Sequence, residues 1–154
     1  MRLRAAATSL LAGVTIVGTT AAATTATTPK QAITKLRAAG LPIGAYRIYT
    51  ASNDPNDLLG RPGQYVGKAN FQDRRVPASA RLGKFDTSAG GSIEVFASTE
   101  DAKRRYRYVR AVTQGMAGAY VEYDYLEGRG FLRLSAHLTP RQVRSYERAF
   151  LRIY

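Results

Sequence analysis

The sequence contains no cysteine, no tryptophan and one histidine, His137. Without cysteine, the chain cannot form a disulfide, a thiolate zinc site, an iron–sulfur cluster or a cysteine nucleophile. A single imidazole excludes any metal site that needs two histidine ligands. Most metalloenzyme and cysteine-enzyme functions are therefore excluded, and we expect neither a cofactor nor a metal.

Long apolar runs are also missing, apart from one near the N-terminus. Arg2 and Arg4 precede an apolar stretch at 5–18, and Ala21-Ala22-Ala23 then supplies the small residues that a signal peptidase accepts. The alternative is a membrane anchor, but the stretch is shorter than the roughly 20 apolar residues that a span needs, and polar threonines follow it. Residues 1–23 are predicted to be a secretory signal peptide.

The rest of the chain has the length of one domain. Residues 24–28 belong to a Thr/Ala tract with little to bury and are predicted to be a flexible leader, whereas 29–154 are predicted to form a single domain. We expect the mature chain to be secreted and monomeric, with no transmembrane segment. It would be either free or held non-covalently at the cell wall.

Acidic residues are few: 11 Asp and Glu stand against 23 Lys and Arg. Removing residues 1–23 takes away two arginines and no acid, which leaves a formal net charge of +10. A GC-rich genome also favours arginine, but a small protein with this charge attracts anions. The expected partner is an anionic envelope polymer or an acidic protein. Base stacking on nucleic acid is not favoured, because Tyr106 falls on the predicted buried stripe of its helix.

Hydrophobic periodicity predicts three helices and five strands. The helices are expected at 29–39, 99–114 and 140–153. The strands are expected at 46–49, 65–71, 92–96, 120–126 and 131–135. The first and last helices begin with the same Thr-Pro-x-Gln pattern, which favours an N-terminal capping box. Between the second and third strands, 72–90 are predicted to be a long, basic loop of raised mobility.

This order, αβββαββα, predicts an α+β domain with a mainly antiparallel sheet of four or five strands and helices packed on one side. The last two strands have a predictable register if Gly128 and Arg129 form a two-residue turn, because apolar residues then pair on one face and an acid meets a base on the other. The predicted pairs are Tyr125 with Leu132, Tyr123 with Leu134, and Asp124 with Arg133.

Two helices carry many arginines. The last helix has four at spacings of three and four residues, which places them on one face, and the preceding helix adds more. Such a stripe is either an ordinary solvated surface or an anion-binding face. The candidate anion-binding residues are Arg141, Arg144, Arg148, Arg152, Arg104, Arg107 and Arg110.

The segment 52–68 is a second candidate site, because polar side chains are concentrated there between prolines and glycines. Its candidate binding residues are Asp54, Asn56, Asp57, Arg61, Tyr65 and Lys68. The segment departs from a phosphate-binding loop at Pro62 and Ala69, and from an EF-hand at Leu59 and Tyr65. An unconventional cation site stays open, but the simplest interpretation is that Asp54 and Asn56 shape turns.

Four segments carry a resemblance to a known family: LRAAGLPIG, NDPNDLLGRPGQYVGKANFQD, GGSIEVFASTEDAKRR and LRLSAHLTPRQV. Over about residues 33–150, the chain resembles a family of small exported proteins and lipoproteins of Gram-positive bacteria, with a DPNxLLGRPxxY-type motif. The resemblance implies export and an envelope location but no particular activity. This chain lacks the acylated cysteine of the family's lipoproteins.

The sequence gives only weak evidence for a catalytic site. Glu94, Glu122 and Asp124 are expected on the polar face of the sheet, where two of them would form an acid–base pair. His137 lies near Ser135, but the sequence has no GxSxG nucleophile elbow.

The leading hypothesis is an exported, non-catalytic binding or accessory protein of the cell envelope. It would recognise an anionic partner through its arginine-bearing helices and the 52–68 segment. The alternatives are a wall-polymer-acting enzyme that uses the sheet carboxylates and a protein-binding inhibitor.

Overall fold

A computed structural model describes residues 27–115 and 122–154. The described chain is a small α+β domain with a five-stranded antiparallel sheet, as predicted. The helices are α1 (Pro29–Ala38), α2 (Thr99–Gly115) and α3 (Pro140–Phe150), with two short 3₁₀ helices, η1 (Ala78–Ala80) and η2 (Thr87–Ala89). The strands are β1 (Ile43–Ile48), β2 (Tyr65–Asp73), β3 (Gly90–Phe96), β4 (Glu122–Glu127) and β5 (Gly130–Ser135).

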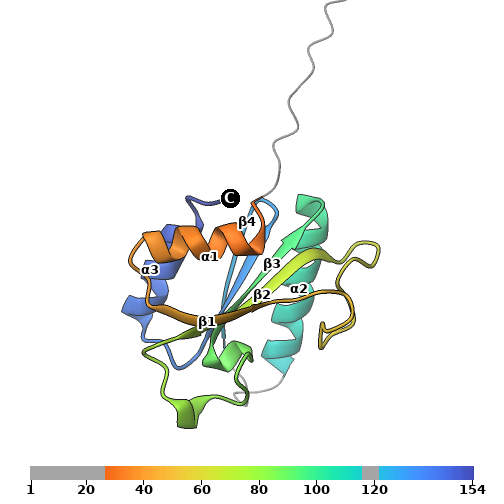
Figure 1. Cartoon of the computed structure of the whole chain (residues 1–154). Helices are drawn as coiled ribbons and strands as arrows, with labels where there is room; N and C mark the ends of the chain where they lie inside the picture. The colour runs from red at the N-terminus through yellow and green to blue at the C-terminus, as the bar shows by residue number, and fades with distance from the viewer. Residues whose placement is uncertain (1–26, 116–121) are drawn as a thin grey trace, which may run out of the picture.

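The strands lie in the order β1-β2-β3-β5-β4 (Figure 1). The hairpin of β4 and β5 turns at Gly128, whose φ of 51° a glycine adopts without strain. Its register is the predicted one: Tyr125 pairs with Leu132, Tyr123 with Leu134, and Asp124 with Arg133. Residues 120 and 121, predicted to begin this hairpin, lie outside the described residues.

Both predicted capping boxes are confirmed. The Thr28 hydroxyl accepts the backbone N–H of Gln31, whose side chain accepts the N–H of Thr28 in return. Thr139 and Gln142 repeat the arrangement at α3. Pro29 and Pro140 occupy the first helical turn, where a missing N–H costs nothing.

The helices lie on both faces of the sheet, so the prediction of helices on one side was wrong for α2. Helices α1 and α3 cover one face, packing side chains such as Ile33 and Phe150 against the sheet residues Phe71, Ile93 and Leu132. Helix α2 packs on the opposite face, and the residues of this smaller core are Tyr65, Phe96, Ala102, Val109 and Phe131. In Figure 1, α2 stands apart from α1 and α3.

The segment 72–90, predicted to be a structureless loop, is more regular than expected. Strand β2 continues to Asp73, β3 begins at Gly90, and η1 and η2 lie between them. Side chains of β2 hold the segment against the sheet, because Asn70 Nδ2 donates to the carbonyl of Phe85 at 2.7 Å and Gln72 Nε2 donates to that of Lys84 at 2.9 Å. Within the described residues, no helix has the length and apolar character needed to span a membrane.

Candidate functional site

The face of the sheet beneath α2 is unusually polar. On one face, the alternating side chains of β2, β3, β4 and β5 contribute to the main apolar core, and on the other they present charged and polar groups to α2. The polar residues of this second face are Lys68, Asn70, Ser92, Glu94, Glu122, Asp124 and Arg133. Because α2 covers them, most are buried and need partners.

Asp54 organises one end of this polar face. Its Oδ1 accepts a hydrogen bond from Lys68 Nζ at 2.9 Å, and its Oδ2 accepts one from the Tyr65 hydroxyl at 2.6 Å. The backbone N–H groups of Leu58 and Leu59 also donate to Oδ2. Burial alone would raise the pKa of Asp54, but these hydrogen bonds outweigh it and hold the pKa well below its usual range.

The same cluster fixes Tyr65 and Lys68. Burial and the hydrogen bond to Asp54 raise the pKa of Tyr65. The Lys68 ammonium lies 5.1 Å from the ring centre of Tyr49 and 5.2 Å from that of Tyr65, within the range of cation–π attraction. Asn56 adds a hydrogen bond to the Tyr65 hydroxyl at 3.2 Å. The predicted residues Asp54, Asn56, Tyr65 and Lys68 therefore form one cluster.

The other predicted residues of 52–68 lie apart from this cluster. Asp57 and Arg61 pair with each other on the surface, both largely exposed. Leu58 and Leu59 pack against the core beneath α2.

Glu94 lies at the centre of a buried charge network. Arg105 of α2 donates from Nε to Glu94 Oε2 at 3.0 Å, and Arg133 Nη1 lies 3.8 Å from Glu94 Oε1. Arg133 also makes a bidentate ion pair with Glu122, in which Nε and Nη2 each donate to a carboxylate oxygen at 2.9 Å. The predicted carboxylates Glu94 and Glu122 do share a face, but both are held by guanidinium groups.

Asp124 stands opposite Arg133, as predicted, yet the guanidinium of Arg133 contacts Glu94 and Glu122 instead. Burial, reinforced by the nearby charge of Glu122, raises the pKa of Asp124 to about 7. Its Oδ1 is buried and has no hydrogen-bond partner in the described part of the chain.

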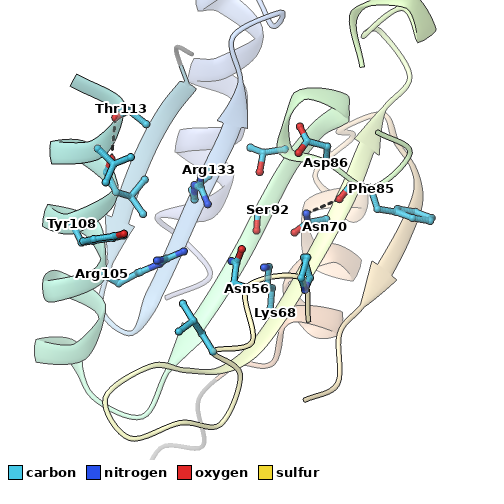
Figure 2. A pocket seen from close by; sticks show the side chains of 15 residues that line it. Asn56, Lys68, Asn70, Phe85, Asp86, Ser92, Arg105, Tyr108, Thr113 and Arg133 are labelled. Atoms are coloured by element: carbon cyan, nitrogen blue, oxygen red, sulfur yellow. Dashed lines mark hydrogen bonds between the residues drawn. The ribbon is translucent and has the colours of Figure 1, made fainter. Parts of the chain in front are cut away.

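A cleft of about 680 Å³ opens between α2, the polar face of the sheet and the loops around Pro55 and Phe85 (Figure 2). This volume is in the range of small-molecule sites. Its charged lining residues are Lys68, Arg105, Arg133 and Asp86. Apolar walls come from Leu58, Val109 and Val112.

The cations of this cleft lie nearer to solvent than the carboxylates that balance them. Lys68, Arg105 and Arg133 have 4%, 10% and 15% of their side chains exposed, whereas Asp54, Glu94 and Glu122 have 0%, 0% and 1%. The cations line the cleft, and the carboxylates that pair with them are more deeply buried. Such a surface attracts an anionic or strongly polar group.

The predicted arginines are exposed, but they do not form one surface. Arg141, Arg144, Arg148 and Arg152 lie on or just after α3, on the face of the sheet opposite the cleft. Arg104, Arg107 and Arg110 lie on the outer side of α2. Arg104 pairs with Asp101, and Arg110 donates to the Tyr106 hydroxyl at 2.8 Å.

Ser135 and His137 are engaged locally. The Ser135 hydroxyl donates to the carbonyl of Ser88 at 2.7 Å and accepts the backbone N–H of His137 at 3.2 Å. His137 is exposed. These contacts are those of a structural serine that closes a turn.

Sequence reasoning missed Asn70 and Ser92 and did not single out Arg105. The alternation of Ser92 and Glu94 with Ile93 and Val95 was a usable signal, because it places polar side chains together on one face of a strand.

Comparison with protein-family models, with curated proteins and with solved structures finds no match. Within residues 27–115 and 122–154, no group of three or more His, Asp or Glu side chains is arranged to hold a metal ion.

Proposed function

We propose that this protein is an exported, non-catalytic binding protein of the cell envelope, and that it recognises an anionic partner at the cleft beneath α2. The observation that carries the proposal is the arrangement of charged side chains in the cleft. Three of the four charged residues that line the cleft are cations, and the carboxylates paired with these cations are more deeply buried. Binding there requires no displacement of the buried ion pairs.

The exposed arginines support the same proposal in a different way. Those of α3 lie too far from the cleft to contact a ligand within it, because the sheet separates them. They add to the overall positive field, which raises the local concentration of anions and the rate of encounter. Specificity then belongs to the cleft and attraction to the whole surface.

The proposal can be tested by retention on purified cell walls, with and without their anionic polymers, across a salt series. Val112 lines the cleft and is 43% exposed, so Val112→Trp should block the opening without disturbing the core. Ala111→Trp is the matched control, because Ala111 is exposed on the same helix and does not line the cleft.

We expect the wild type and Ala111→Trp to be retained on walls that carry anionic polymers, and Val112→Trp to be lost at the same salt concentration. The proposal is wrong if the wild type is not retained at low salt, or if Val112→Trp is retained as well as Ala111→Trp.

A further inference from the structure

A row of four polar residues crosses the sheet beneath the cleft. Asn70 of β2 pairs with Ser92 of β3, Ser92 pairs with Arg133 of β5, and Arg133 pairs with Asp124 of β4. Successive members are therefore about 4.8 Å apart. Figure 2 shows the first three side by side on neighbouring strands.

This row collects most of the unsatisfied buried polar atoms. In the described chain, four buried side-chain atoms lack a hydrogen-bond partner, and three belong to the row: Asn70 Oδ1, Ser92 Oγ and Asp124 Oδ1. Asn70 and Ser92 are 6% and 1% exposed and line the cleft. Buried polar groups without partners destabilise a fold and are rare, so two such atoms facing one cleft indicate a place for a ligand.

The Asn70 end of the row requires a hydrogen-bond donor. Asn70 Nδ2 donates to the carbonyl of Phe85, which fixes the amide so that Oδ1 is the unsatisfied atom. An amide oxygen only accepts hydrogen bonds, whereas the Ser92 hydroxyl both donates and accepts. A carboxylate or a fully ionised phosphate ester offers no proton to Asn70, whereas a ligand hydroxyl can donate to Asn70 Oδ1 and hydrogen-bond with the Ser92 hydroxyl.

The Arg133 end offers the opposite chemistry, because its side chains donate hydrogen bonds. Arg105 and Arg133 line the cleft. The backbones of Arg133 and Asn70 are two strand spacings apart, about 10 Å. A guanidinium has five N–H donors, and Arg105 uses Nε and Nη2 on Glu94. The apolar wall of Val109 and Val112 suits the C–H face of a ring.

We infer that the cleft binds an acidic sugar unit, a compact ring that carries hydroxyls and one carboxylate or phosphate. Its hydroxyls contact Asn70 Oδ1 and Ser92 Oγ, and its acidic group lies beside Arg105 and Arg133. The inference rests on the proposed function, because it names the ligand of the same cleft. The acidic sugar is either free or a unit of an envelope polymer.

Calorimetric titration of the purified protein tests the ligand chemistry. Glucuronate and glucose 6-phosphate are the acidic probes. Glucose lacks the acid, and inorganic phosphate lacks the hydroxyl-bearing ring. We expect at least one acidic sugar to bind, and both reference compounds to bind at least about tenfold more weakly. The inference is overturned if neither acidic sugar binds, or if phosphate alone binds as tightly.

A glucuronate-containing oligosaccharide in the same titration distinguishes the two sources. Tighter binding of the oligosaccharide than of glucuronate assigns the site to a polymer, and equal or weaker binding assigns it to the free sugar. Both results support an acidic sugar as the ligand.

Two serines form a matched pair for mutation, since both are 1% exposed on the same face of the sheet. The Ser135 hydroxyl is hydrogen-bonded, and the Ser92 hydroxyl is not. Ser92→Ala should leave the melting temperature unchanged or raised and weaken acidic-sugar binding about tenfold. Ser135→Ala should lower the melting temperature and leave the affinity unchanged.

The opposite pattern contradicts the inference: full affinity in Ser92→Ala, or a loss of melting temperature as large as that of Ser135→Ala. The Val112→Trp and Ala111→Trp variants separate this inference from the proposed function. If the acidic sugars fail but Val112→Trp still abolishes wall retention, the ligand assignment is wrong and the binding function stands. If Val112→Trp has no effect on retention, both are wrong.

Discussion

At the scale of single residues, Asp54 explains how a lysine is tolerated inside this small fold. Its carboxylate contacts the Lys68 ammonium, the Tyr65 hydroxyl and two backbone N–H groups, so all of these partners depend on one side chain. Removing one member of a buried ion pair leaves the other charged and uncompensated, which is far more costly than removing an exposed pair.

We therefore predict that Asp54→Asn lowers the free energy of unfolding by about 3–5 kcal/mol. Urea denaturation followed by circular dichroism measures this loss. Asp57→Asn is the control in the same loop, because Asp57 pairs with Arg61 at the surface, and its midpoint should match that of the wild type. A similar loss in both variants would mean that loop conformation, and not the buried charge, sets the stability.

Asp124 makes the stability of the fold depend on pH in the opposite direction to Asp54. Its pKa in the folded chain is raised to about 7, above the value of about 3.9 in an unfolded chain, so the folded state holds the proton more tightly between those values. Stability from this residue is full below about pH 4 and declines as the pH rises to 7. Asp54 and Asp73 have lowered pKa values, so their contribution is present above about pH 4 and lost at lower pH.

Asp124→Asn should accordingly raise the free energy of unfolding at pH 8, on the order of 1–2 kcal/mol after allowance for solvent screening. It should have little effect at pH 4, where the wild-type carboxyl is mostly protonated in the folded chain. Urea midpoints at pH values from 4 to 8 check this, and the variant's profile should be flatter than that of the wild type. A variant that is less stable at pH 8 would show that the Asp124 carboxylate is compensated.

Some residues of the site can be predicted from the sequence, and others cannot. Asp54, Asn56, Tyr65 and Lys68 crowd into one turn-rich segment, and the structure brings them together. Asn70 and Ser92 matter because of hydrogen bonds that they do not make, and because strand pairing sets them side by side. Neither property can be predicted from the sequence without knowing the register of β2 and β3.

At the scale of elements, local chemistry was the most predictable. The capping boxes depend on residues three apart, and the hairpin register depends on a two-residue turn, so each is encoded in a short stretch. The face that α2 covers was not predictable in the same way. Strands β3 and β4 are separated in the sheet by β5, so the path of α2 is set by a crossover between non-neighbouring strands.

The cap of α3 gives an element-scale prediction. Thr139→Ala removes the hydroxyl that accepts the N–H of Gln142 and should lower the free energy of unfolding by about 1 kcal/mol. Thr139→Ser keeps the hydroxyl and should restore most of the loss. Thermal denaturation of the two variants beside the wild type measures the difference, and an equal loss in both would assign the effect to the threonine methyl group.

At the scale of the whole molecule, the positive charge is divided between two sides. The arginines of α3 lie on the face opposite the cleft, and those of α2 lie on the helix that forms a wall of the cleft. A general positive field depends on net charge and weakens with salt, whereas direct contacts depend on position. The arginines of α2 and α3 therefore form two surfaces that can be separated experimentally.

Two charge-matched triple variants make this separation. One replaces Arg104, Arg107 and Arg110 by Gln, and the other replaces Arg141, Arg144 and Arg148. Both remove three positive charges, so both should reduce wall retention at low salt. If the partner is a polymer seated in the cleft, it also passes over α2, and the α2 variant should elute at lower salt than the α3 variant. Equal elution would mean that the arginines act through net charge alone, and earlier elution of the α3 variant would place the main contact on the face opposite the cleft.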